Sequence, residues 1–270
     1  MKKCVFINLA DATSRRAALE ASFAAANANG WALSRFEART PADVAHVGGT
    51  LTPVEKACFE SHRSAVAKHR ESNDPLFVVE DDAVFAPQAF QVLDQLLATS
   101  DYDIVFTDVA ICDLALMTKV ASRRDAMAAA GQFMLLDLAQ SSYFGATAYA
   151  VRGGAKRRLH AALQAATELD LPYDLYLRDL GRTGKLKIGA CFPFVTTVAP
   201  EADQSQIQSE ADAPFDRVMN AFRRLMYVDR DLTAVRRDLT GLKKRYSSET
   251  AELTGQVFAT LVAPGFPIDR

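Results

Sequence analysis

Short apolar runs alternate with longer amphipathic stretches along most of this chain. The apolar runs predict strands at residues 4–9, 34–38, 76–79, 102–106, 131–138, 146–151 and 186–198. Between them, apolar residues at steps of three and four predict helices at residues 15–28, 53–70, 87–98 and 153–166. Strands that alternate with helices are typical of an α/β fold with a mainly parallel sheet.

The helix predicted at 53–70 has the clearest start signal. Thr52 stands three residues before Glu55, so the pair is placed to form a capping box, and Pro53 occupies the first helical position. The run Asn73-Asp74-Pro75 then breaks the helix and leads into the next strand. Three candidate caps precede the first helix: Asp11, Thr13 and Ser14.

The chain changes character after residue 205, which divides a first domain (1–205) from an extension (206–270). Apolar residues recur at steps of three and four from Phe215 to Tyr246 and predict one amphipathic helix, or two in sequence. Residues 214–246 carry nine basic and four acidic side chains, so nine minus four gives +5 within a chain of net charge -2.

Three accounts of this extension stay open. It packs on the first domain, which is the ordinary place for a helix with an apolar stripe. It pairs with a second copy in a homodimer, because its spacing is close to a heptad repeat. It lies on the anionic inner face of the inner membrane, where each basic residue contributes about 1 kcal/mol.

Composition narrows the functional classes. The chain has 270 residues, 49% hydrophobic and 24% charged, which is ordinary for a globular protein, and its net charge gives no general attraction to nucleic acid. Its 4 cysteines are scattered without a CxxC pair, which argues against a zinc ribbon or a disulfide framework. The N-terminal apolar run is too short for a signal peptide, and no stretch approaches the ~18 apolar residues of a membrane span. We therefore expect a cytoplasmic protein.

Three consecutive acids, Glu80, Asp81 and Asp82, directly follow the predicted strand at 76–79. Ligand sites of parallel sheets lie at such strand ends, and Mn²⁺ and Mg²⁺ prefer carboxylate oxygens. Because strand side chains alternate, Glu80 and Asp82 are expected to point the same way and to bind the metal. Glu80 or Asp81 would accept a hydrogen bond from a sugar hydroxyl. A solvated turn or a helix cap is the alternative. Asp108 also follows a predicted strand.

Basic and polar side chains elsewhere suit an anionic ligand. Arg15 and Arg16, just after the first strand, present guanidinium groups that match a diphosphate, with a solvated helix face as the alternative. Cys58 and His62, four apart on one helix, are a candidate metal pair, but no further Cys/His cluster completes a zinc site.

The run Ser61-His62-Arg63 more simply supplies hydrogen bonds to a ligand or to the acidic residues, with a structural histidine as the alternative. No GxSxG elbow, Walker loop or GxGxxG motif occurs in the chain, so the usual nucleophile and dinucleotide signatures are missing.

Six blocks in order resemble glycosyltransferase family 25, the family of bacterial lipooligosaccharide galactosyltransferases and animal collagen galactosyltransferases. They are INLADATSRRAALE, RFEA, GGTLTPVEKACFESHR, VVEDDAVF, FGATAYAV and PYDLYL, spread over roughly residues 3–200. The pair LTPVEKACFESHR and EDDAVF is the most specific part of the resemblance.

The resemblance implies a GT-A-type nucleotide-diphospho-sugar transferase fold, a UDP-sugar donor, a glycan or glycolipid acceptor, and Mn²⁺ or Mg²⁺ at the EDD acids. It also implies inversion at the anomeric carbon, and hence a β-galactosyltransferase. Asp174 in PYDLYL matches an aspartate of the family and is expected to be the catalytic base, with a helix N-cap as the alternative. Asp108, as a carboxylate at a strand end, is the reserve candidate for the base. Donor-side positions carried over in the same way are Asn8, Leu9, Arg15, Arg16, Gly145 and Thr147.

Two departures and two rival functions qualify the resemblance. RFEA is followed by Arg39-Thr40-Pro41, and the last histidine, His160, comes too early to complete a metal shell. A metal-dependent nucleotidyltransferase would also need acids and a nucleotide pocket, but INLADATSRR has no glycine-rich phosphate loop. A non-catalytic nucleotide-sugar-binding protein of the same fold would not need intact EDD acids and Asp174.

Overall fold

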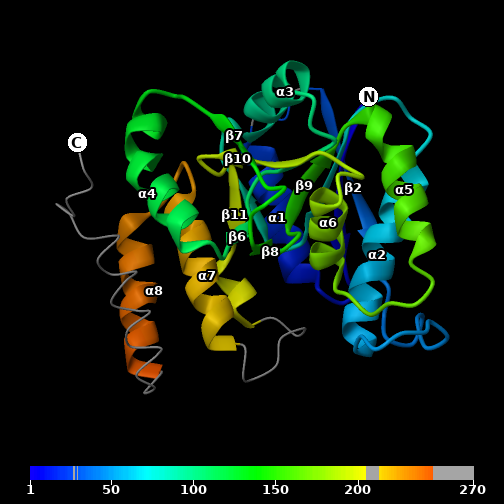
Figure 1. The fold of residues 1–270 in the computed structure, drawn as a ribbon. Helices are drawn as coiled ribbons and strands as arrows, with labels where there is room; N and C mark the ends of the chain where they lie inside the picture. Colours follow the sequence, from blue (N-terminus) through cyan, green and yellow to red (C-terminus); the bar gives the residue numbers. More distant parts are fainter. Residues whose placement is uncertain (27, 29, 205–212, 246–270) are drawn as a thin grey trace.

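The centre of the molecule is a seven-stranded sheet with helices on both faces (Figure 1). The computed structural model describes residues 1–26, 28, 30–204 and 213–245. From edge to edge the strands are β2 (Trp31–Glu37), β1 (Lys2–Asn8), β3 (Leu76–Glu80), β9 (Ala148–Val151), β5 (Ile104–Phe106), β10 (Ile188–Phe192) and β7 (Met134–Asp137). Strands β9 and β7 run antiparallel to their neighbours, and the other neighbouring pairs are parallel. The predicted α/β fold with a mostly parallel sheet is confirmed.

The sheet is buried on both faces, which explains the uninterrupted apolar runs of its strands. In β1, Val5 and Ile7 belong to one layer of the core, whereas Cys4 and Phe6 belong to the other. The first layer is built with α2 (Pro53–His69), α4 (Leu114–Ala129), α5 (Lys156–Ala165), α6 (Tyr173–Arg182), α7 (Ala213–Met226) and α8 (Leu232–Arg245). The second is built with α1 (Thr13–Ala25) and α3 (Ala89–Thr99).

The start of α2 is as predicted. Thr52 accepts a hydrogen bond from the backbone N–H of Glu55, whose side chain accepts one from the backbone N–H of Thr52, and Pro53 begins the helix. The candidate caps of α1 were wrong, because its N-cap is Ala12 and no side chain caps it.

Two small antiparallel sheets and the helices α4 and α6 were not among the predicted elements. β4 (Ala83–Phe85) pairs with β11 (Thr196–Val198), and β6 (Ala110–Ile111) pairs with β8 (Tyr143–Phe144). Short 3₁₀ helices occupy Gly153–Ala155 and Pro200–Gln204. Because β3 ends at Glu80 and β4 begins at Ala83, Asp81 and Asp82 form a turn. Strand alternation therefore does not decide where Asp82 points, and that step of the sequence argument was wrong.

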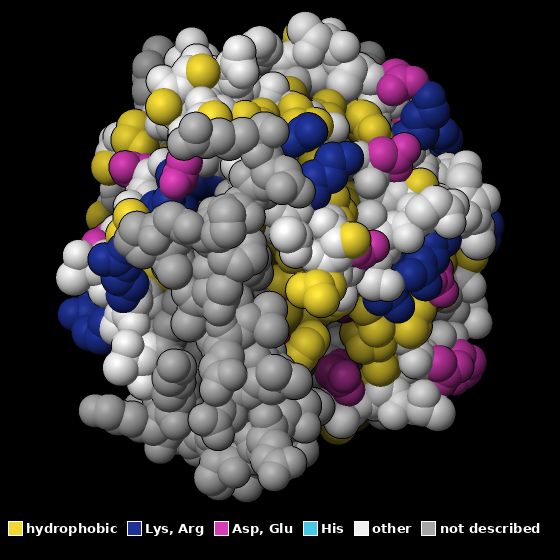
Figure 2. All heavy atoms as spheres, turned by 60° about the vertical axis from the view of Figure 1, so that its left-hand side comes forward, with side chains coloured by type: hydrophobic (Ala, Val, Ile, Leu, Met, Phe, Trp, Pro, Cys, Tyr) yellow, Lys and Arg dark blue, Asp and Glu magenta, His cyan; other side chains and the backbone are white. Residues whose placement is uncertain are grey.

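The extension begins with a helix that is part of the fold. In α7, Val218, Phe222 and Leu225 are buried in the core, which is the packing expected of its apolar stripe. Among the described residues on the side that Figure 2 turns forward, Lys and Arg side chains form small groups with hydrophobic and acidic ones between them. The homodimer and membrane accounts stay predictions, as does the domain boundary at residue 205. Tyr246 lies outside the described residues. None of the helices in the described part of the chain is long and apolar enough to span a membrane.

Candidate active site

Three parallel strands bring their carboxyl ends to the same edge of the sheet. β1 ends at Asn8, β3 ends at Glu80 next to Ile7 of β1, and Asp108 follows β5 by two residues. A cleft of ≈ 220 Å³ opens at this edge. Eight of the residues expected from the sequence line it: Asn8, Leu9, Arg15, Ser61, His62, Glu80, Asp81 and Asp82.

Asp81 is held by two residues from the first β–α connection. Its Oδ2 accepts a hydrogen bond of 2.7 Å from Asn8 Nδ2, and Arg15 Nη1 lies 3.3 Å from its Oδ1. The Asn8 amide is oriented in turn by Arg35, whose Nε donates to Asn8 Oδ1 at 2.9 Å. Burial raises the pKa of Asp81, against the opposing effects of Asn8 and Arg15. The result is a fixed carboxylate at the cleft wall.

Glu80 is fixed by α2 and by the neighbouring strand. Its Oε1 lies 3.2 Å from His62 Nε2, and its backbone N–H donates to the carbonyl of Thr147 at 2.7 Å. Burial pushes the pKa of Glu80 upward, but the hydrogen bond from His62 and the nearby arginines hold it below its ordinary value. Glu80 therefore presents a carboxylate, not a carboxylic acid, to the cleft.

Asp82 has an oxygen without a partner. Among the described residues nothing hydrogen-bonds to its Oδ1, although that atom is shielded from solvent. Burial, with repulsion from Glu80, raises the pKa of Asp82 from 3.8 to about 7 despite the opposing charge of Arg223. A buried, unpaired carboxylate oxygen is costly unless a proton or a cation satisfies it. Asp82 and Glu80 therefore fit the hard-cation site expected from the sequence.

Arg223 of α7 is the site residue that the sequence did not reveal. Its Nε and Nη2 donate to Asp108 Oδ2 at 3.0 and 2.5 Å, while Thr196 Oγ1 donates to Asp108 Oδ1 at 3.2 Å. Asp108 is fully buried, so it is an anchor for α7 and not an accessible carboxylate. Arg223 is one of nine basic residues in a repetitive stretch, and no local pattern distinguishes it from the others.

Asp174 lies in the first turn of α6, where Pro172, not Asp174, is the N-cap. Its Oδ2 accepts a hydrogen bond of 2.6 Å from the backbone N–H of Gly145, and its Oδ1 accepts one of 2.8 Å from Leu175. Gly145 has φ +87°, a left-handed conformation that favours glycine, and a Cβ there would lie 3.7 Å from Arg223 Nη1. Asp174, which is the candidate base, and Arg223 therefore both lie next to Gly145.

Four of the expected donor-side residues do not line the cleft: Gly145, described above, and Arg16, Arg63 and Thr147. Arg16 pairs with Glu20 at 2.8 Å on the exposed side of α1. Arg63 donates to the carbonyl of Ala166 at 2.6 Å and supports the loop before α6. Thr147 is buried and acts through its backbone carbonyl on Glu80. Arg16 and Arg63 therefore make contacts within the protein through their side chains, and Thr147 makes one through its backbone.

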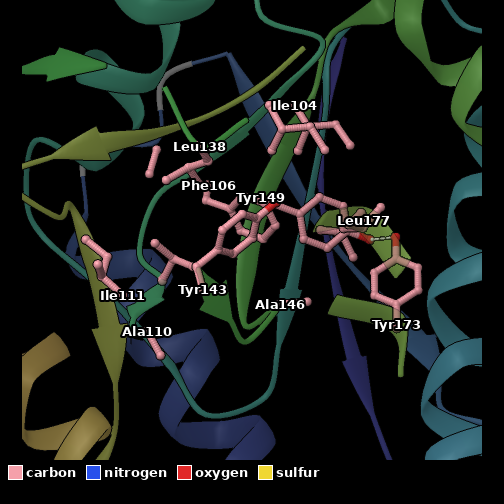
Figure 3. Packing of buried hydrophobic residues seen from close by; sticks show 14 of the residues in the cluster. Ile104, Phe106, Ala110, Ile111, Leu138, Tyr143, Ala146, Tyr149, Tyr173 and Leu177 are labelled. Carbon is pink, nitrogen blue, oxygen red and sulfur yellow. Dashed lines mark hydrogen bonds between the residues drawn. The ribbon is translucent and has the colours of Figure 1, made fainter. Parts of the chain in front are cut away.

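His62 is held by two buried tyrosines. Its ring stacks on Tyr173 with centroids 4.3 Å apart, and its Nδ1 lies 3.1 Å from Tyr149 Oη. The two tyrosine hydroxyls are hydrogen-bonded at 2.6 Å (Figure 3). One donor atom each of Cys58, His62 and Glu80 lies within 4.8 Å of the others. A glutamate from β3 therefore lies beside the Cys58–His62 pair, for which the sequence offered no further ligand.

A comparison with protein families identifies the chain. The model of "Glycosyltransferase family 25 (LPS biosynthesis protein)" matches residues 1–177 of 270, and a search of curated proteins returned no match. The matched range includes the acidic turn and Asp174, and it ends inside α6, so Arg223 lies beyond it. From this match and the arrangement at the strand ends, the chain belongs to glycosyltransferase family 25, a family of lipopolysaccharide biosynthesis.

Proposed function

We propose that the protein is an inverting glycosyltransferase that moves galactose from UDP-galactose to a glycan or glycolipid acceptor in lipopolysaccharide biosynthesis, with Mn²⁺ or Mg²⁺ as cofactor. Family membership supports the use of a sugar donor and a glycan acceptor. The main structural support for a metal-dependent donor site is Asp82, which lines the cleft with Glu80 and has an unpaired Oδ1.

In this proposal Asp82 and Glu80 would hold the metal ion, which would supply positive charge against the diphosphate of the donor. Asp81, fixed by Asn8 and Arg15, accepts a hydrogen bond from a hydroxyl of the donor. Arg15 is 39% exposed and lines the cleft, so its guanidinium group is available to a diphosphate oxygen. Asn8 and Leu9 border the nucleoside.

Transfer with inversion is a single in-line displacement. The acceptor hydroxyl gives its proton to a carboxylate oxygen of Asp174, and its oxygen forms a bond to C1 of the sugar. The bond from C1 to the diphosphate oxygen breaks on the opposite face, and UDP leaves with the electron pair. Gly145 orients Asp174 through its backbone N–H, which supports a fixed direction of attack.

The two rival functions have less support. A nucleotidyltransferase would need a phosphate-binding loop, and the family match favours a glycosyltransferase instead. A non-catalytic binding protein would use the same carboxylate for a metal ion and a nucleotide, but it would not need Asp174 as a base. Release of UDP, measured with and without Mn²⁺, separates these cases, because only the transferase turns over UDP-sugar in a metal-dependent way.

A thermal-shift panel of UDP-galactose, UDP-glucose and UDP-xylose with Mn²⁺ tests the donor. UDP-galactose should raise the Tm of the wild-type protein most, and Asp82→Asn should abolish the shift. Asp229→Asn, at an exposed position outside the cleft, is the matched control and should keep it. If another UDP-sugar raises the Tm more than UDP-galactose does, that sugar replaces galactose as the proposed donor. No shift with any UDP-sugar, together with no UDP release, would reject the proposal.

A further inference from the structure

A second group of potential metal ligands lines the same cleft. Cys58 and His62 come from successive turns of α2, and Glu80 comes from the end of β3. We propose that these three residues form a binding site for a thiophilic divalent cation such as Zn²⁺, distinct from the hard-cation site at Asp82.

The spacing of the ligand atoms suits a tetrahedral ion. Zinc binds nitrogen and carboxylate oxygen at about 2.0–2.2 Å and sulfur at about 2.3 Å, so ligand atoms in a tetrahedron lie about 3.3–3.6 Å apart. The distance of 3.2 Å between His62 Nε2 and Glu80 Oε1 is already close to that value. No two of the three ligand atoms are more than 4.8 Å apart, so one ion is within reach of all three.

The surroundings of His62 prepare it for this role. For Nε2 to bind an ion, the imidazole proton must reside on Nδ1 and be donated to Tyr149 Oη, 3.1 Å away. The Tyr149 hydroxyl can in turn donate a hydrogen bond to Tyr173 Oη. The stacking of Tyr173 fixes the plane of the His62 ring. A histidine ligand whose other nitrogen is hydrogen-bonded is the usual arrangement in zinc proteins.

The donor set distinguishes this site from the acidic turn. A thiolate selects zinc and similar ions, whereas carboxylate oxygens alone favour Mn²⁺ and Mg²⁺. Because the three residues line the cleft, the fourth position is open to water or to a ligand oxygen. The Cys58 thiol must lose its proton to bind the ion as a thiolate, so the affinity rises with pH.

One consequence rests on the proposed function. Glu80 is shared between the two sites, so Zn²⁺ at Cys58 and His62 competes with the metal-dependent binding of the donor. Zinc should then inhibit UDP release in assays with Mn²⁺, and Cys58→Ser should remove that inhibition.

Cobalt spectroscopy of the metal-free, full-length protein tests the site without reference to activity. Co²⁺ should produce a thiolate-to-cobalt absorption band that saturates at one ion per chain and disappears when Zn²⁺ is added. Cys58→Ser should abolish the band, and His62→Gln and Glu80→Gln should weaken Co²⁺ binding at least about tenfold. Cys112→Ser is the matched control, because Cys112 is exposed and outside the cleft.

Several outcomes would overturn the inference. They are absence of the band in the wild-type protein, its survival in Cys58→Ser, and its loss in Cys112→Ser. Loss of the band in Asp82→Asn would also count against two separate sites. If Cys58→Ser does not fold, alkylation of the wild-type protein decides the question, because Zn²⁺ should protect Cys58 and leave Cys112 reactive. Since none of these measurements uses a UDP-sugar, their failure leaves the proposed transferase activity to its own test.

Discussion

Arg223 of α7 donates two hydrogen bonds to a single oxygen of Asp108, across 115 positions of sequence. Arg223 is 4% exposed and Asp108 is fully buried, so each charge depends on the other for its stabilisation. The contact joins the extension, which lies beyond the family match, to the strand ends that form the cleft. In this chain the structural unit around the site therefore includes α7.

The first prediction concerns this ion pair. Arg223→Gln should lower the free energy of unfolding by about 3–5 kcal/mol, because it leaves Asp108 buried without its cation. Urea denaturation measures the loss, and Arg236→Gln, at an exposed position of α8, is the control. The double variant Asp108→Asn/Arg223→Gln should be more stable than Arg223→Gln alone. If the losses in free energy of unfolding of the two single variants add up in the double variant, the two residues are not energetically coupled.

The second prediction follows from the raised pKa of Asp82. Between pH 3.8 and about pH 7, Asp82 holds a proton in the folded protein that it has lost in the unfolded chain. The free energy of unfolding therefore falls as the pH rises through this window. Without metal, Asp82→Asn should therefore be more stable than wild type at about pH 8, by about 4 kcal/mol, with the gain vanishing towards about pH 4. Denaturation in a chelator across this range is the measurement.

Added Mn²⁺ provides the counterpart of that experiment. The ion should stabilise the wild-type protein above neutral pH and leave Asp82→Asn unchanged, because only the wild type offers the ionised oxygen. A pH-independent difference between the two proteins would contradict the raised pKa of Asp82.

The third prediction isolates the candidate base. Asp174→Asn keeps an oxygen that can accept the Gly145 N–H, but it removes the basic carboxylate. Transfer should fall by about 10²–10⁴-fold, while the Tm and its shift with the donor stay near wild type. Asp179→Asn, on the exposed side of the same helix, should retain activity. An active Asp174→Asn variant would move the role of the base to another group.

The fourth prediction concerns Gly145. Alanine at this position must adopt φ +87°, which costs about 1–2 kcal/mol, and it alters the backbone N–H that orients Asp174. We expect a fall in kcat that is larger than the loss of stability, measured as the decrease in Tm, can explain. Gly184→Ala is the matched control, since Gly184 also has positive φ (+68°) but has open space around it. Equal losses of activity in the two variants would mean that backbone strain alone explains the effect.

The fifth prediction tests a close approach in the fold. A Cβ at Gly153 would lie 1.8 Å from the carbonyl oxygen of Asn73, whereas one at the adjacent Gly154 would meet nothing within 4 Å. Gly153→Ala should therefore destabilise the protein by about 1–3 kcal/mol, measured by denaturation. Gly154→Ala should stay near the wild-type value, and a comparable loss there would contradict the predicted clash.

Much of the fold follows from local signals. The capping box at Thr52 and Glu55 begins α2, and apolar runs mark most strands of the sheet. Helix α4 was missed, because only Met117, Val120 and Arg124 are buried and its apolar face is weak. The antiparallel direction of β9 could not be predicted from its sequence either. A strand that is buried on both faces has the same apolar pattern in either direction.

By itself the sequence determined the α/β class, the position of the acidic turn at a strand end, and the family resemblance, because these depend on periodicity and on contiguous motifs. Only the tertiary structure decided which side chains meet. It pairs Arg223 with Asp108, turns Arg16 away towards Glu20, and adds Glu80 to Cys58 and His62. Such contacts join distant segments, and their energies depend on burial and distance, which no local pattern encodes.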